Sequence, residues 1–182
     1  MKVALLGLGS AAKQIHIPAY KKISEITIVG GYDLNIDENT FDFPLYESPE
    51  ELLTNTEPDI VAIATPTSTH FALTKLAVNA GCHVFVEKPF MSNLQEADEI
   101  IKLAKNKQRW VVVNNQYRFM NVHQAAKNKI DNGELGELLF INASQTFYVS
   151  KQTESGWRGG DLQRTCKEFG IHVLDLCRYF FD

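Results

Sequence analysis

Residues 3–12 read Val3-Ala4-Leu5-Leu6-Gly7-Leu8-Gly9-Ser10-Ala11-Ala12, and this stretch decides the fold. Its apolar residues run without alternation into glycines, which is typical of a strand buried on both faces that turns tightly into a helix. The end of the stretch matches the pattern G-x-G-x-x-G/A, in which Gly7 makes the turn, Gly9 lets backbone approach a pyrophosphate and Ala12 keeps helix and sheet close. A tight strand–helix turn without a ligand would show the same residues.

Four further apolar runs follow at 26–29, 59–64, 82–86 and 110–113. Helical spacing is found at 11–22, 68–80 and 93–107. Buried strands that alternate with helices indicate right-handed βαβ units. We therefore expect an α/β fold with a doubly wound parallel sheet in a dinucleotide-binding domain over residues 1–118.

The pattern changes after Arg118. Helical spacing is found at 121–132 and 165–181, and a run rich in β-formers predicts a strand over 138–149. One strand and two helices cannot close a core of their own, so residues 119–182 are interpreted as an incomplete C-terminal α+β domain for substrate binding and oligomerisation. The exposed edge of the strand would pair with another chain, and we expect a homo-oligomer.

Composition excludes several classes of protein. The 182 residues carry 18 Lys+Arg against 22 Asp+Glu, a net charge of −4, where a nucleic-acid binder would need a basic stripe. No apolar run approaches the ~18 residues of a membrane helix. Three scattered cysteines without ligand-like spacing indicate neither a metal site nor a disulfide framework, and they fit a reducing cytoplasm. The sequence therefore predicts a cytoplasmic protein without a nucleic-acid or membrane partner.

An acidic residue stands where a dinucleotide site needs one. Asp33 follows the second apolar run, 33 − 12 = 21 residues after Ala12. A carboxylate at this place accepts both ribose hydroxyls and repels a 2′-phosphate, which favours NAD over NADP. We predict NAD as the cofactor, with contacts from Gly7, Gly9, Ser10, Ala11, Ala12 and Asp33.

Two motifs follow the next strands, at the edge where open α/β sheets bind ligands. Thr65-Pro66 and His70 follow the third run, and they could simply begin the next helix. Glu87-Lys88-Pro89 follows the fourth run, where Lys88 is either a salt-bridged surface residue or an ammonium that meets a substrate hydroxyl. We assign to cofactor binding the residues Thr65, Pro66, His70, Glu87 and Lys88.

The last helix carries a histidine between two carboxylates. Spacings of four and three place Glu168, His172 and Asp175 on one helical face. Such a set can transfer a proton, with one acid fixing the imidazole tautomer. The alternative is a capping and packing set, in which Asp175 orients or packs.

Together and in this order, the motifs resemble the Gfo/Idh/MocA family of nicotinamide-dependent oxidoreductases. The matching segments are Gly7-Leu8-Gly9, His16-Ile17-Pro18-Ala19, Thr65-Pro66 with His70, Ala80-Gly81-Cys82-His83-Val84 before Glu87-Lys88-Pro89, Asn115-Gln116-Tyr117-Arg118-Phe119, Gly133-Glu134-Leu135-Gly136, and Gly170-Ile171-His172 with Asp175. The resemblance implies a Rossmann domain followed by an α+β domain with an open, mainly antiparallel sheet. It also implies hydride transfer between NAD(P) and a hydroxyl or carbonyl of a sugar, inositol, nucleotide-sugar or related polyol.

The resemblance further implies roles for individual residues. Lys88 would hydrogen-bond and help deprotonate the reacting hydroxyl, and His172 would be the general acid/base. Glu168 stands where the family has an aspartate, which leaves its reach to substrate or to His172 open, and Arg118 would be structural or contact substrate. The residues expected to bind substrate are Lys88, Arg118, Glu168 and His172. Because the family continues past Asp182, the alternative function is a non-catalytic dinucleotide-binding remnant or sensor.

Overall fold

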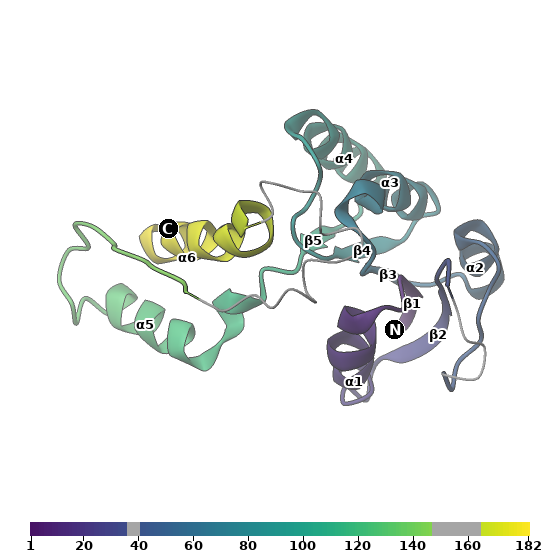
Figure 1. Ribbon diagram of the computed structural model, residues 1–182, viewed down its shortest axis with the longest axis horizontal. Helices are drawn as coiled ribbons and strands as arrows, with labels where there is room; N and C mark the ends of the chain where they lie inside the picture. The colour runs from purple at the N-terminus through teal and green to yellow at the C-terminus, as the bar shows by residue number, and fades with distance from the viewer. Residues whose placement is uncertain (36–40, 147–164) are drawn as a thin grey trace. The chain divides into compact units, whose positions relative to one another are not determined.

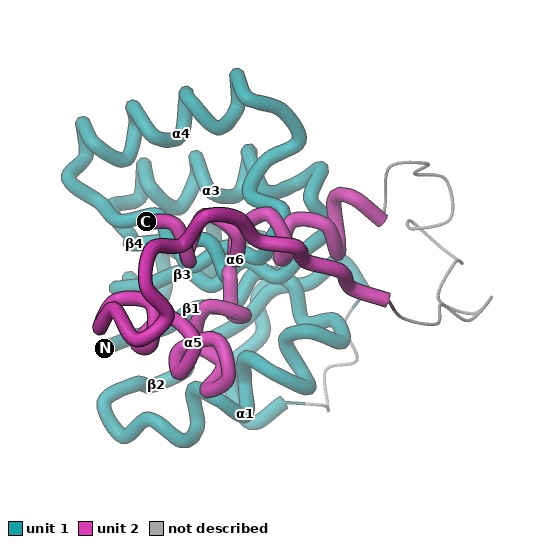
Figure 2. The backbone as a smooth tube through the Cα atoms, turned by 90° about the vertical axis from the view of Figure 1, so that its left-hand side faces the viewer, with its two compact units in different colours: residues 1–114 teal, residues 115–182 magenta. Residues whose placement is uncertain are grey.

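The structure is a computed structural model and describes residues 1–35, 41–146 and 165–182 (Figure 1). The chain divides into two compact units, residues 1–114 and residues 115–182, which Figure 2 draws in two colours. The boundary expected from the sequence lies after residue 118, and the role of residues 119–182 in substrate binding and oligomerisation stays a prediction.

The first unit contains a five-stranded parallel sheet. Its strands are β1 (Lys2–Leu6), β2 (Thr27–Tyr32), β3 (Ile60–Ile63), β4 (His83–Val86) and β5 (Val111–Val113). They lie in the order β2-β1-β3-β4-β5, with Val3 paired to Ile28 on one side and to Ile60 on the other. All five predicted runs thus form strands, and the α/β parallel sheet is confirmed.

Both faces of the sheet are buried, because successive side chains of a strand point to opposite faces. Ala4 and Leu6 face one core, which is covered by α2 (Pro49–Thr56), α3 (His70–Asn79) and α4 (Leu94–Lys107). Val3 and Leu5 face a second core, which is covered by the π-helical turn η1 (Ala12–His16) and by α1 (Ile17–Tyr20). Helices on two faces leave the carboxyl ends of the strands as the place where loops meet.

Local signals explain where the helices begin and end. Asn93 caps α4 by accepting a hydrogen bond from Glu96 N at 2.9 Å, and Gly81 after α3 has a φ of +85°. Helix α2 was not among the predicted helices. Its signal is present, because Ser48 caps it by accepting from Glu51 N at 3.1 Å and a proline follows in the first turn.

The second unit corrects one expectation. Its elements are η3 (Gln116–Phe119), α5 (Asn121–Asp131), the π-helical turn η6 (Thr165–Gly170) and α6 (Ile171–Phe181), so both predicted helices are present. The strand predicted over 138–149 is wrong for residues 138–146, which form no strand, and 147–149 lie outside the described residues. Leu139 and Phe140 are 77% and 78% exposed. A strand needs neighbours for its backbone, and the described part of this unit contains none, so no antiparallel sheet is found there.

Candidate active site

The loop after β1 has the geometry of a phosphate cradle. Gly7 has a φ of +92°, and a Cβ built there would lie 2.7 Å from backbone at the end of β3. A Cβ at Gly9 would meet no atom within 4 Å, which leaves room for a ligand at the backbone. Ser10 and Ala11 open the helix, and Ala12 packs against the sheet with no exposed surface. Amides at such a helix start bind anions, so these residues fit a pyrophosphate.

Asp33 follows β2 and folds back over the glycine loop. Its Oδ2 accepts a hydrogen bond from Leu8 N at 2.7 Å, and its Oδ1 accepts one from Asn35 N at 3.0 Å. A carboxylate offers about four lone-pair sites, so ribose hydroxyls can bind to the same group. Asp33 therefore ties the loop to β2, and its contact with a ribose stays a prediction.

Thr65 and Pro66 follow β3 and lie beside the glycine loop, since a Cβ at Gly7 would come 2.8 Å from Thr65 Cγ2. Thr69 Oγ1 lies 2.7 Å from Thr65 Oγ1 and 2.8 Å from Pro66 O, which closes the turn into α3. His70 is 1% exposed, and its ring nitrogens face backbone carbonyls. The predicted cofactor contacts of these residues remain predictions, and the structure gives the His70 ring a backbone partner on each nitrogen.

Glu87 and Lys88 follow β4 at the same edge. Glu87 Oε1 accepts hydrogen bonds from His16 Nε2 at 2.8 Å and from Asn114 Nδ2 at 2.7 Å. Burial alone would raise the pKa of Glu87, but these hydrogen bonds and the charge of His16 hold that pKa below its usual value. The carboxylate is thus anionic next to Lys88, which is partly buried and precedes a cis bond to Pro89.

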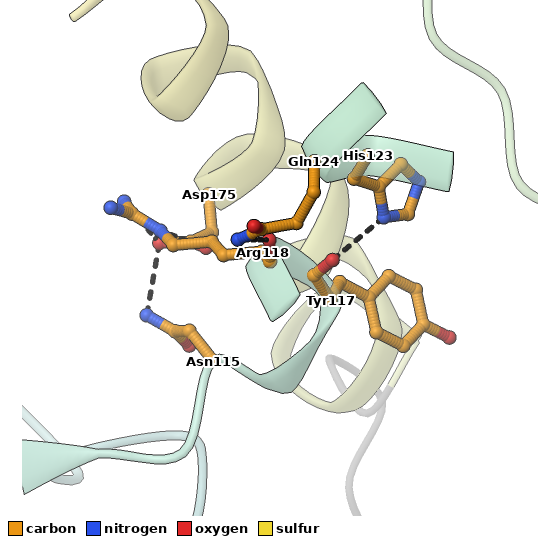
Figure 3. A network of polar contacts seen from close by, with 6 residues as sticks. All are labelled: Asn115, Tyr117, Arg118, His123, Gln124 and Asp175. Atoms are coloured by element: carbon orange, nitrogen blue, oxygen red, sulfur yellow. Dashed lines mark hydrogen bonds and ion pairs between the residues drawn. The ribbon is translucent and has the colours of Figure 1, made fainter. Parts of the chain in front are cut away.

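In the second unit, a polar network gathers on Asp175 (Figure 3). Arg118 Nε and Nη2 donate to its two carboxylate oxygens at 2.7 Å and 2.8 Å, and Asn115 Nδ2 donates at 2.9 Å. Asp175 raises the pKa of Arg118, and the guanidinium lies 5.3 Å from the ring centroid of Tyr179. This two-pronged contact gives Arg118 a structural role between η3 and α6. A contact of Arg118 with substrate stays a prediction.

His172 is the buried side chain of the described part of the second unit, with 4% exposure. Its ring stacks on Tyr117 with centroids 4.0 Å apart and planes 8° apart. His123 also stacks on Tyr117, and its Nδ1 lies 2.7 Å from Tyr117 O (Figure 3). The imidazole of His172 therefore has a fixed ring plane, as a proton-transfer group requires.

Glu168 lies outside the α-helix that carries His172. Residues 165–170 form the π-helical turn η6, and the α-helical spacing begins at Ile171. The predicted common face assumed α-helical spacing throughout, and Asp175 is bound to Arg118 and Asn115. The first unit thus brings the predicted cofactor residues to one sheet edge, while the joint action of Lys88 with Glu168 and His172 stays a prediction.

Residues 1–115 match the family model described as an oxidoreductase family with an NAD-binding Rossmann fold. This chain belongs to the Gfo/Idh/MocA oxidoreductase family. As a family member it is 25% identical over 194 residues to D-glucoside 3-dehydrogenase of Escherichia coli (strain K12), covering 98% of this chain and 53% of that protein. It is also 25% identical over 186 residues to scyllo-inositol 2-dehydrogenase (NADP(+)) of Bacillus subtilis (strain 168), covering 100% and 52%.

A solved structure shows the same Gfo/Idh/MocA fold. The WlbA dehydrogenase of Chromobacterium violaceum, in complex with NADH and UDP-GlcNAcA, superimposes with a TM-score of 0.88. The match is 22% identical and covers 99% of this chain and 55% of that one, so it speaks for the fold alone. The chain spans about half the length of the curated relatives it matches.

The described residues contain no sign of a metal site or a membrane span. Within 1–35, 41–146 and 165–182, no His, Cys, Asp and Glu side chains gather in a way that could hold a metal ion. No helix in those ranges is long and apolar enough to cross a bilayer. The cysteines Cys82, Cys166 and Cys177 form no disulfide.

The structure adds three side chains to which the sequence assigned no role, namely His16, Asn114 and Tyr117. Asn114 directly follows β5, and a polar residue behind a buried strand is a usable signal because parallel strands end at one edge. His16 and Tyr117 stand in segments that resemble the family, but no local pattern indicated their partners.

Proposed function

We propose that this chain is the cofactor-binding and catalytic part of an NAD(P)-dependent oxidoreductase that acts on a hydroxyl or carbonyl. The observation that carries the proposal is that a site residue follows each of the strands β1 to β4, at one edge of the sheet. In chain order these residues are Gly7, Asp33, Thr65 and Lys88. Open α/β sheets bind ligands at this edge, at the point where the strand order reverses, and here the order reverses at β1.

The glycine loop and Asp33 fit a dinucleotide. The space at Gly9 admits a pyrophosphate against backbone amides, and the carboxylate of Asp33 lies over the same loop, 2.7 Å from Leu8 N. A 2′-phosphate would meet the negative charge of Asp33, so we propose NAD rather than NADP. The Bacillus subtilis relative bears NADP(+) in its name, so the affinities for NADH and NADPH must be compared directly.

In the proposed reaction, bound nicotinamide supplies the hydride acceptor or donor. Lys88 donates a hydrogen bond to the substrate oxygen and stabilises negative charge on it, and His172 takes or returns the hydroxyl proton. Glu168 orients the imidazole or the substrate, and Arg118 supports the helix that carries His172. A sugar, inositol or nucleotide-sugar-like polyol is the proposed substrate class, supported by relatives whose names refer to a glucoside and an inositol.

The experiment has two arms. Quenching of protein fluorescence measures NADH and NADPH binding, and absorbance at the NADH band follows turnover with a panel of sugars, inositols and UDP-sugars. We expect tight NADH binding and turnover with at least one polyol, and Lys88→Ala should abolish turnover while NADH affinity stays within a few-fold. NADH binding without any turnover would make the chain a non-catalytic dinucleotide binder or sensor. Absence of binding would refute both functions.

Self-association and a cytoplasmic location remain part of the proposal. The expected oligomer rested on an exposed strand at 138–149, and residues 138–146 form no strand. Light scattering on the purified chain measures the mass directly, and a monomer at micromolar concentration would contradict the oligomer.

A further inference from the structure

Two buried histidines flank the turn that carries Lys88. His16 is 3% exposed and contacts Glu87, which precedes Lys88. His70 is 1% exposed and contacts the backbone carbonyls that follow Lys88. Neither ring is among the groups that the proposed reaction uses. Histidines buried this deeply need hydrogen-bond partners, and here those partners all belong to loops at the carboxyl edge of the sheet.

The contacts on each side of Lys88 are called clamps here. In the first clamp, His16 from η1 and Asn114 after β5 both contact Glu87, which follows β4. His16 comes from η1, where Ile17 N bonds to Ala12 O in a π-helical turn, and its Nε2 faces Glu87 Oε1 at 2.8 Å. Since a carboxylate only accepts, His16 Nε2 donates, and Asn114 Nδ2 behind β5 donates to the same oxygen.

Tyr20 also lies near the Glu87 carboxylate. Burial, and then the charge of Glu87, raise the pKa of Tyr20 to about 12. The Tyr20 ring lies 6.0 Å from the His16 ring, so both belong to the wall around this carboxylate. Lys88 N lies 3.2 Å from Glu87 Oε2 and can donate to it, which extends the fixed carboxylate into the backbone of Lys88. The His16–Glu87 pair thus holds the turn that carries Lys88 through a contact with the main chain of Lys88.

The second clamp consists of His70 and the backbone carbonyls that it contacts on the other side of Lys88. His70 Nδ1 lies 3.0 Å from Pro89 O and 3.2 Å from Phe90 O, and its Nε2 lies 3.0 Å from Thr65 O. Each ring nitrogen thus faces a backbone carbonyl, and the nitrogen that carries the N–H in the tautomer present donates to its partner. His70 therefore ties the segment after Lys88 to the end of β3, beside the glycine loop.

We propose that His16 and His70 are positioning residues, which hold the turn 87–90 from its two sides and so fix where the Lys88 ammonium lies. The inference rests on the proposed function for the meaning of Lys88, but the placement itself is measurable without turnover. A group that acts at a reacting centre must be positioned to within a fraction of an ångström, and the contacts around it fix that position. A buried imidazole pair supplies that support better than exposed contacts, because water does not compete for its hydrogen bonds.

The test measures how accessible the Lys88 amine is. The full chain is trace-labelled with acetic anhydride, and mass spectrometry compares acetylation at Lys88 with that at Lys75, whose amine pairs with Glu99 on the surface. Releasing either clamp exposes the partly buried Lys88, so His16→Leu and His70→Leu should each raise its relative labelling by about threefold or more. His16→Gln keeps a donor for Glu87, so the relative labelling of Lys88 in this variant should stay within about twofold of the wild type.

A matched control perturbs the packing and leaves the hydrogen bond. Phe85 meets the His16 ring edge-on at 5.8 Å, and Phe85→Leu should not change the labelling of Lys88. If His16→Leu does not fold, as judged by thermal unfolding, Glu87→Leu replaces it and should also raise the labelling, because it removes the acceptor for His16 Nε2. Unchanged Lys88 labelling in the folded clamp variants, or an equal rise in Phe85→Leu, overturns the proposal.

Turnover, where it is found, gives an independent readout. The His16→Leu variant should lower kcat by about tenfold or more while NADH affinity stays within a few-fold, because the glycine loop and Asp33 remain in place. A fall in kcat without altered labelling contradicts positioning through Lys88. If no substrate is turned over, the labelling result still decides the inference, so its failure and that of the proposed function are distinguishable.

Discussion

The two units of this chain are stabilised in different ways. In the described residues, every buried apolar side chain lies between Val3 and Ala104, and most of them belong to two cores on the faces of the parallel sheet. In the described part of the second unit His172 alone is buried, and the contacts there centre on the bidentate Arg118–Asp175 pair and on ring stacking at Tyr117. The first unit thus depends on apolar burial and on close backbone packing, while the second depends on a few polar and aromatic contacts.

The difference bears on the roles proposed for the two units. A dinucleotide loop needs a rigid backbone, which the buried sheet provides, and the cofactor residues follow its strands. The proposed acid/base histidine instead lies on α6, a helix held by side-chain contacts. Loss of one contact should therefore act locally in the second unit, whereas backbone strain in the first should affect the whole sheet.

The largest expected effect tests the first unit. Gly7→Ala places a Cβ 2.7 Å from the backbone of Ala64 at a φ of +92°, and it should destabilise the sheet by about 3 kcal/mol or more. Urea unfolding and segment-resolved hydrogen exchange measure this, with faster exchange across β1 and β3. The matched control is Gly9→Ala, where a Cβ meets open space. It should keep stability within about 0.5 kcal/mol and weaken NADH binding about tenfold or more. Equal stability losses in both variants would contradict the close-packing account.

The next effect tests the second unit. Asp175→Ala leaves the Arg118 guanidinium and Asn115 without their shared acceptor, and it should cost about 2 kcal/mol locally. Hydrogen exchange should quicken in α6 and η3 while the sheet amides are unchanged. Asp131→Ala is the control, since its ion pair with Lys127 is an exposed i,i+4 contact worth about 0.5 kcal/mol. Faster exchange throughout the sheet after Asp175→Ala would show that the two units are not stabilised separately.

The sequence predicts most of the first unit because its signals are local. Each strand is one uninterrupted apolar run, and Gly7 and Asp33 stand next to the strands that position them. The strand expected at 138–146 failed because β-formers such as Leu139 and Phe140 describe a side chain that suits a sheet, not the presence of a neighbouring strand. The capping signal at Ser48 was local as well, and it could have predicted α2.

The contacts that complete the site are not local. His16 and Glu87 are 71 positions apart, and Arg118 and Asp175 are 57 apart. Neither spacing nor periodicity reports such a pair, because each partner by itself looks like an ordinary helix or strand-end residue. The fold brings the partners together: His16 in η1 meets Glu87 after β4, and Arg118 in η3 meets Asp175 in α6.

A smaller effect isolates the ring stack. Tyr117→Leu removes the aromatic partner of His172 and should cost about 1 kcal/mol, while Tyr117→Phe keeps the ring and should cost almost nothing. The Phe variant loses only the hydroxyl that accepts from Gln145 Nε2 at 3.1 Å near the surface. Proton NMR gives the sharper measurement, because the ring-current shift of the His172 imidazole should persist in Tyr117→Phe and vanish in Tyr117→Leu. An unchanged His172 signal in the Leu variant would refute the stacking.

The smallest effect is a pH dependence in the first unit. The pKa of Glu87 is lowered in the folded chain from its ordinary value of 4.5, so its contribution to stability is complete above pH 4.5 and is lost as the pH falls through the folded pKa. The effect is small because burial of the carboxylate opposes the hydrogen bonds from His16 and Asn114. Glu87→Gln removes the titration, so its stability difference from the wild type should shrink as the pH falls below 4.5. Phe85→Leu, which contacts the same imidazole, should differ from the wild type by a constant amount across that range, and a parallel curve for Glu87→Gln would mean that folding does not lower the pKa of this carboxyl.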